Sequence, residues 1–120
     1  MNKDFHLFQK EFKKWQGRFG LTGYKVYFKY EELEASFADI QVSQSSRVVT
    51  VRLNSNLPDK DNPFKDVKAD AKHEALHLLV SRLEENGRYR YCSDAEIYES
   101  TEELVVKLQN LIPDRELLSE

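Results

Sequence analysis

The 120-residue sequence contains little cysteine, glycine or proline, and it has no long hydrophobic run. With a single cysteine, Cys92, it cannot form an internal disulfide, so we expect a protein made for a reducing cytoplasm. Four glycines and three prolines exclude collagen-like and linker-like compositions. No apolar run exceeds Leu78–Val80, whereas a membrane span needs roughly 20 residues. We therefore expect no membrane span and, given the polar amino terminus, no signal peptide.

The chain also lacks an excess of positive charge. Its 18 Lys and Arg face 21 Asp and Glu, which leaves a formal net charge of −3. This balance offers no broad positive field to a phosphate backbone, so nucleic acid is not an expected partner. Hydrophobic residues make up 40% and charged residues 32% of the chain. That composition is typical of a compact globule, and residues 1–120 are short enough to form one domain.

The first half of the chain predicts one helix followed by three strands. From residue 4 to residue 20, large apolar side chains recur at helical steps of three and four and predict one buried face. These side chains are Phe5, Phe8, Phe12, Trp15 and Phe19. Alternating patterns predict strands over residues 24–30, 35–42 and 47–53, the last two forming a hairpin. The 35–42 strand has a polar face that we expect to be exposed to solvent, whereas the β-branched 47–53 strand is more typical of the interior of a sheet.

The second half predicts two helices. Asn62 followed by Pro63 predicts an N-cap, and helical spacing continues over residues 64–85. The predicted buried arc of this helix comprises Val67, Ala71, Ala75, Leu78, Leu79 and Leu83. Ser93 and Glu96 have the spacing of a capping box, which opens a last helix that runs to Ile112. Its predicted core face comprises Tyr98, Thr101, Val105, Leu108 and Ile112. Together these elements predict an α+β fold.

The first of these two helices carries the motif His73-Glu74-Ala75-Leu76-His77, an HExxH pattern. Side chains four residues apart on a helix differ by about 40° around the axis and one turn along it, so both imidazoles can bind one metal ion. Glu74 is displaced from His73 by roughly 100°. This displacement places Glu74 beside the metal and not among its ligands, where it can accept a proton as a general base.

A catalytic zinc ion normally has three protein ligands, so the motif predicts a third. No histidine follows His77, which makes a carboxylate the expected substitute. The candidates on the last helix are Glu96, Glu99, Glu102 and Glu103. We favour Glu102, one turn after Tyr98 at the edge of the predicted inward face, although a rotated helix would present Glu99 or Glu103 instead. Cys92 and His6 are less favoured ligands.

A family resemblance accompanies this motif. The HExxH helix, the strands before it and the segment Glu102–Leu108 resemble the minimal gluzincins, small phage and prokaryotic metallopeptidase-like domains of the zincin type. The resemblance implies a zincin-like fold with Zn²⁺ bound by His73, His77 and Glu102, and with Glu74 as the base. It also implies a cleft bordered by an edge strand that pairs with extended peptide, for which residues 35–42 are the best match. The chain lacks the second subdomain of larger zinc peptidases.

The predicted function is zinc-dependent hydrolysis of a peptide bond, with a peptide or protein as substrate. Zinc would activate a water molecule, and Glu74 would take its proton and return it to the leaving amine. Tyr89, Tyr91 and Tyr98 are candidates to stabilise the oxyanion. Two alternatives remain open: a non-catalytic module stabilised by zinc on the same ligands, and a metal-free interaction domain whose HExxH match is accidental.

Overall fold

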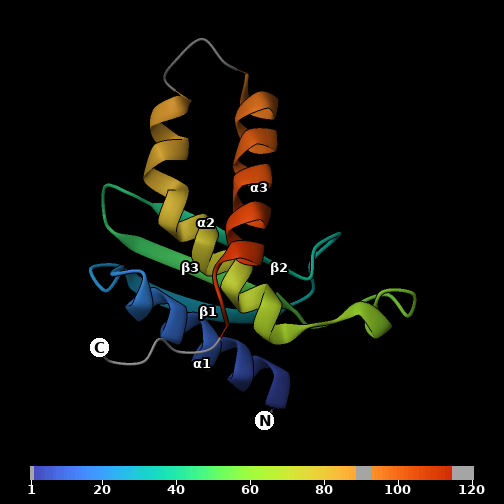
Figure 1. The fold of residues 1–120 in the computed structure, drawn as a ribbon. Helices are drawn as coiled ribbons and strands as arrows, with labels where there is room; N and C mark the ends of the chain where they lie inside the picture. The colour runs from blue at the N-terminus through green and yellow to red at the C-terminus, as the bar shows by residue number, and fades with distance from the viewer. Residues whose placement is uncertain (1, 89–92, 115–120) are drawn as a thin grey trace.

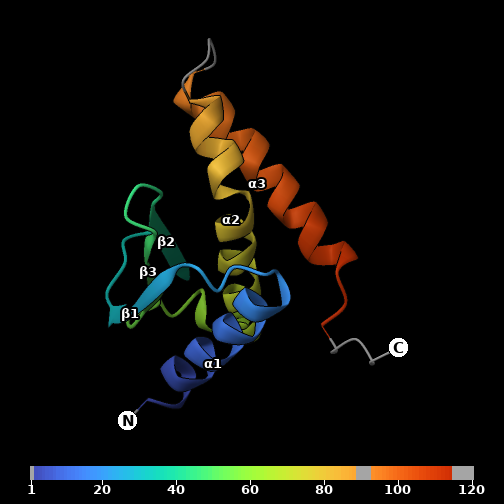
Figure 2. The ribbon, with the colours of Figure 1, turned by 90° about the vertical axis from the view of Figure 1, so that its left-hand side faces the viewer.

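The computed structural model describes residues 2–88 and 93–114 and has the predicted α+β order, with a helix first. Its elements are α1 (Lys3–Arg18), β1 (Lys25–Glu31), β2 (Ala38–Ser43), β3 (Val48–Asn54), a short 3₁₀ helix η1 (Asn62–Phe64), α2 (Val67–Gly87) and α3 (Asp94–Leu111). Figures 1 and 2 show α2 between the sheet on one side and α3 on the other, with α1 packed near the start of α2. None of the helices in the described ranges has the length and apolar character needed to cross a membrane.

Helix α1 supplies the aromatic part of the core, as its spacing predicts. Phe8 and Phe12 are fully buried, and only 1% of Trp15 is exposed. These rings pack against the inward side chains of β3, including Val49 and Val51. Large aromatic groups contribute most of the apolar area that such a small core can bury. The helix therefore fixes the sheet against the base of α2.

The three strands form a mixed sheet in the order β1-β3-β2. β1 runs parallel to β3, whereas β2 runs antiparallel to β3 and forms the predicted hairpin with it. The β-branched strand β3 is therefore the central one, which confirms the prediction from its composition. Strand β2 lies at an edge, and no second strand pairs with it in the described part of the chain. Strand β2 also contacts α2.

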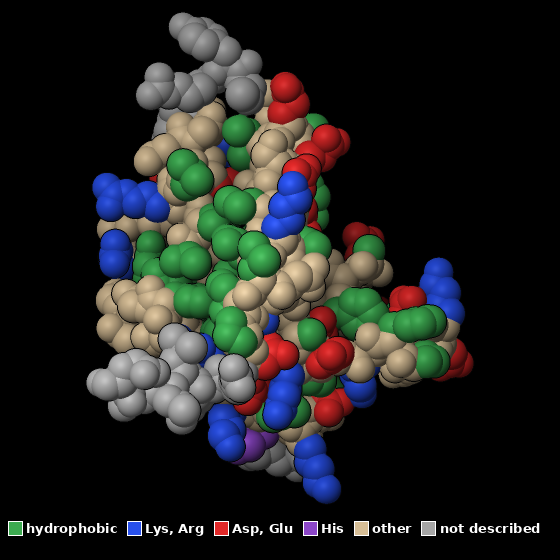
Figure 3. Space-filling model, viewed as in Figure 1, with side chains coloured by type: hydrophobic (Ala, Val, Ile, Leu, Met, Phe, Trp, Pro, Cys, Tyr) green, Lys and Arg blue, Asp and Glu red, His purple; other side chains and the backbone are tan. Residues whose placement is uncertain are grey.

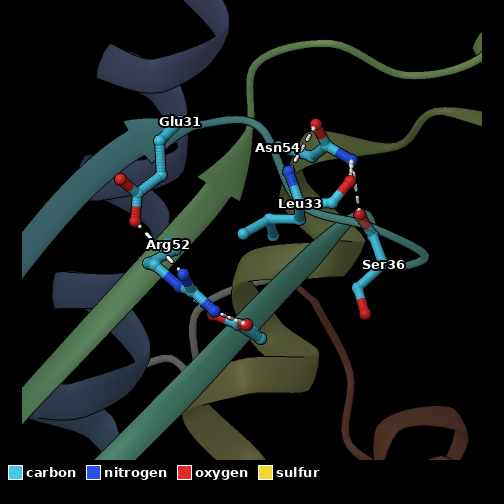
Figure 4. Close-up of polar contacts among 6 residues, drawn as sticks. Glu31, Leu33, Ser36, Arg52 and Asn54 are labelled. Atoms are coloured by element: carbon cyan, nitrogen blue, oxygen red, sulfur yellow. Dashed lines mark hydrogen bonds and ion pairs between the residues drawn. The ribbon is translucent and has the colours of Figure 1, made fainter.

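Polar contacts hold the start of this edge strand. Figure 4 shows the side chains involved, among them Glu31, Leu33, Ser36, Arg52 and Asn54. The buried Asn54 amide accepts from the Leu33 N–H at 3.3 Å and donates to the Leu33 and Ser36 carbonyls at 3.1 and 2.8 Å. Arg52 of β3 forms a two-pronged pair with Asp39 of β2 and also reaches Glu31 at 3.2 Å. Such planar pairing fixes orientation as well as distance, so β2 has a defined position at the sheet edge.

Helix α2 begins later than predicted. Asn62 and Pro63 open η1 instead, and Lys65 is extended, with φ −66° and ψ 128°, which separates η1 from α2. The N-cap of α2 is Asp66, whose carboxylate accepts from the Ala69 N–H at 3.1 Å. The prediction of an N-cap at Asn62 was therefore wrong for the long helix, because Pro63 fits the first turn of either kind of helix.

The predicted buried arc of α2 is correct only in its first half. Ala71, Ala75 and Leu78 are buried, but Leu79 is 39% and Leu83 68% exposed. The later part of α2 projects beyond the sheet and, within residues 2–88 and 93–114, has α3 beside it (Figures 1 and 2), so the sheet does not cover apolar positions there. Hydrophobic side chains consequently gather on the surface over α2 and α3 (Figure 3). Helical periodicity cannot show where a supporting sheet ends.

Helix α3 packs on α2 through a narrower face than its sequence predicts. Its capping box, formed by Ser93 and Glu96, is present. Val105 is fully buried against Leu76 and Val80 of α2. Tyr98 is 58% exposed, so its assignment to the core face was wrong. Among the described residues α3 packs mainly on α2, so one narrow stripe suffices for packing.

The two proposed N-caps can be compared directly. We expect Asp66→Ala to lower the free energy of unfolding by about 1 kcal/mol, since it removes a side-chain cap from a first-turn N–H. Asn62→Ala should change it by much less, because the Asn62 side chain caps no helix here. Urea unfolding followed by circular dichroism measures both values, and equal losses for the two variants would contradict this assignment.

Candidate metal centre

Helix α2 presents the two motif histidines on one side. The ring centroids of His73 and His77 lie 4.9 Å apart with an interplanar angle of 66°. Their side chains are 24% and 14% exposed, which leaves each ring partly shielded yet open to the neighbouring cleft. One helical turn separates the residues, so α2 alone brings both imidazoles to the same place.

Helix α3 adds a carboxylate from the other side. Glu102 Oε2 lies 3.5 Å from His73 Nε2, and Glu102 Oε1 lies 2.5 Å from His77 Nε2. One donor atom from each of these three residues lies within 4.8 Å of the other two. The structure thus brings together the three residues predicted as ligands, although they come from two helices.

The other predicted ligands lie elsewhere. Glu103 pairs with Lys107 at 2.8 Å on the exposed side of α3, and Glu96 belongs to the capping box. Glu99 and His6 are exposed and do not line the cleft that contains the histidines. Cys92, together with the oxyanion candidates Tyr89 and Tyr91, lies outside the described residues. Tyr98 lines the cleft.

One residue of this centre, Gln109, was not predicted from the sequence. Its Oε1 atom lies 2.9 Å from His73 Nδ1, and its Nε2 atom donates to the Ala69 carbonyl at 3.0 Å. Because the amide nitrogen is committed to a carbonyl, the amide oxygen faces the imidazole and accepts from Nδ1–H. This tautomer leaves Nε2 of His73 with a lone pair directed toward Glu102, the arrangement typical of a metal-binding histidine.

The three donors could hold a metal ion, and tetrahedral zinc sets the spacing that they would need. Bonds of about 2.0–2.1 Å place two ligand atoms roughly 3.3 Å apart. The His73–Glu102 separation of 3.5 Å is close to this value. The His77–Glu102 separation of 2.5 Å is a direct contact between the two side chains, so Glu102 must withdraw by roughly 1 Å to admit an ion. Two imidazoles and one carboxylate are also a donor set of catalytic zinc sites.

Burial at the centre favours a neutral His77 imidazole and a protonated Glu74. Burial lowers the pKa of His77, and this effect outweighs the opposite influence of Glu102. Burial also raises the pKa of Glu74 to about 8, and the negative charges of Asp39 and Glu102 contribute to the rise. A divalent cation beside Glu74 would oppose that rise by stabilising its carboxylate. Neutral imidazole is the form that binds metals.

Glu74 and the three donors share a cleft of about 750 Å³. Residues 36–42 of the edge strand and its approach form one wall, and α2 with α3 forms the other. Gln44, just after β2, donates to Ser81 of α2 at 2.7 Å and ties the far end of the strand to the helix. The edge strand therefore runs alongside the helix that carries the histidines and Glu74.

No protein-family model, curated protein or solved structure matches the chain. The resemblance to minimal gluzincins therefore stays a prediction.

The hydrogen bond from His73 to Gln109 predicts a measurable effect on metal binding. Gln109→Met removes the acceptor while keeping the length of the side chain, so we expect zinc affinity to fall about 10-fold or more. Competition with a chromophoric chelator measures this affinity. Asn110→Ala, an exposed substitution next along α3, should leave it within 2-fold. A Gln109→Met protein that binds zinc as tightly as wild type would remove Gln109 from the site.

A second prediction concerns Asp70, whose Oδ2 atom is buried without a hydrogen-bond partner among the described residues. Burial raises the pKa of Asp70 from 3.8 to about 6, and the charge of Asp66 adds to the rise. The folded chain therefore binds this proton more tightly than the unfolded chain does, so wild-type stability falls as pH rises from about 4 to 6.

Asp70→Asn should remove this pH dependence. We expect the variant to be more stable than wild type at pH 7 by roughly 1 to 2 kcal/mol, since one pKa unit corresponds to about 1.4 kcal/mol and solvent screens a partly exposed group. The difference should vanish near pH 4. Urea unfolding in the presence of EDTA, which excludes bound metal, gives both values, and a difference independent of pH would contradict the account.

Proposed function

We propose that this chain is a zinc-dependent peptidase in which His73, His77 and Glu102 bind the metal and Glu74 is the general base. The observation that carries the proposal is the approach of Glu102, from a separate helix, to both histidines beside a buried glutamate in an open cleft. If the HExxH match were accidental, the Glu102 carboxylate would not be expected to lie next to both histidine rings. The reducing cytoplasm expected from the single cysteine is the proposed location.

The proposed reaction uses two groups of different kinds. A zinc ion at the three donors would polarise both a water molecule and the substrate carbonyl. Glu74 would accept a proton from the attacking water as its oxygen bonds to the carbonyl carbon, and would then donate that proton to the amine as the C–N bond breaks. Glu74 is only 6% exposed, so bulk water competes little for this proton.

The proposed substrate is an extended peptide. β2 has an unpaired edge in the described part of the chain and forms a wall of the cleft. An extended peptide can add to such an edge through backbone hydrogen bonds, which position a carbonyl without reading side chains. Tyr98, exposed and lining the same cleft, is the oxyanion donor that we propose among the three tyrosines.

Two substitutions separate metal binding from chemistry. Glu74→Gln should keep zinc affinity within a few-fold and lower peptide turnover by about 10²- to 10⁴-fold, the range for loss of general acid–base catalysis. Glu102→Ala should weaken zinc binding by about 100-fold or more, since a ligand contributes more than an outer partner. Zinc content and cleavage of a quenched fluorescent peptide library are the measurements.

Glu103→Ala is the matched control, because it removes a neighbouring glutamate that pairs with Lys107 on the exposed side. It should change neither zinc content nor turnover. Full activity in Glu74→Gln would contradict the assigned base. Stoichiometric zinc without turnover in wild type would instead support the non-catalytic module, and absence of zinc would support the metal-free alternative.

A further inference from the structure

A lysine adjacent to the motif is buried at the junction of three helices. The side chain of Lys72 in α2 is only 5% exposed, and its Nζ atom lies 5.1 Å from the centroid of the Trp15 ring in α1. Lysine is almost never fully buried unless its charge is paired and hydrogen-bonded. The partners of this ammonium therefore indicate what it does.

All three Lys72 partners lie at the end of α3. Nζ donates to the Gln109 carbonyl at 2.7 Å, to the Ile112 carbonyl at 2.6 Å and to Asp114 Oδ1 at 2.9 Å. An ammonium group has three hydrogens, so these contacts use its full capacity. The carboxyl end of a helix carries partial negative charge and unpaired carbonyls, which a buried cation stabilises.

The sequence of α3 creates the need for such a donor. The carbonyl of Gln109 would normally accept from the N–H four residues later, but that residue is Pro113, which has no N–H. Lys72 supplies the missing donor from a different helix. The last turn of α3 is thus bound to α2 by a charged contact that its own backbone cannot replace.

This contact has a direct route to the metal centre. Gln109 is held through its carbonyl by Lys72 and through its side-chain amide by His73 and Ala69, so three residues of α2 bind one residue of α3. Glu102 lies seven residues earlier on the same helix, about 10 Å along a rigid axis. The axial position of α3 at Gln109 therefore sets where the Glu102 carboxylate meets the histidines.

We propose that Lys72 is a positioning residue, whose buried ammonium anchors the last turn of α3 and holds Glu102 and Gln109 opposite the histidines. This inference rests on the metal site of the proposed function. It goes beyond that site, because Lys72 is neither a metal donor nor a residue that lines the cleft. A shift of α3 by a fraction of an ångström would spoil a three-donor geometry before it unfolds the helix pair.

The test compares Lys72→Met, which removes the ammonium and keeps the apolar stem, with Lys72→Arg, which keeps a charged donor. We expect Lys72→Met to lower zinc affinity about 10-fold or more and to change the visible absorption spectrum of bound Co²⁺, which reports ligand geometry. Lys72→Arg should retain most of the zinc affinity and a Co²⁺ spectrum close to that of wild type. Lys65→Met is the matched control, because this lysine pairs with Asp4 of α1 instead of α3, and it should bind both metals like wild type.

A loss of stability alone would not reproduce these results, because both measurements are made on folded protein. Zinc affinity is measured at limiting metal, and the Co²⁺ spectrum is recorded at saturating metal. Should Lys72→Met fail to fold, Lys72→Gln keeps a polar group in the same place but is too short to reach the three acceptors, and the same loss is expected. Wild-type affinity and an unchanged Co²⁺ spectrum in a folded Met or Gln variant overturn the inference and leave the proposed function standing. A wild-type chain that binds neither metal overturns both.

Discussion

The packing of α3 against α2 is the contact on which the candidate centre depends. Val105 of α3 is fully buried against Leu76 and Val80 of α2, and this apolar seam brings the two helices together without fixing their relative slide. Polar contacts at the far end of α3, made by Lys72 and Gln109, are directional and supply that register. Three donor atoms from two helices can meet only when both the spacing and the register are correct.

The sheet contributes a different part of the arrangement. Its central strand β3 is buried by the aromatic side chains of α1, while β2 remains at the edge beside α2. The pair between Arg52 and Asp39 and the hydrogen bond between Gln44 and Ser81 hold this edge at its two ends. The cleft therefore has one wall that offers backbone groups and one that offers imidazole and carboxylate groups, which is the combination that the proposed peptidase needs.

Local features of this molecule were predictable from sequence, and long-range ones less so. The proximity of His73 and His77 follows from helical spacing alone, and Glu102 was favoured because it borders an inward stripe. That stripe wrongly included Tyr98, so the choice of Glu102, which lies beside both histidines in the structure, rested on the remaining positions of the stripe. Gln109 could not be identified, because its role depends on which carbonyl of α2 receives its amide. Pro113 does show in the sequence that a carbonyl of α3 lacks its usual donor, but not which residue replaces it.

The central claim is that one zinc ion binds to two imidazoles of α2 and one carboxylate of α3. Zinc-edge X-ray absorption spectroscopy of the full chain loaded with one equivalent tests it most directly. The account predicts two histidine nitrogens at about 2.0–2.1 Å together with oxygen scatterers at similar distance, and no sulfur. A sulfur scatterer at about 2.3 Å, or fewer than two imidazoles at the metal, would contradict it.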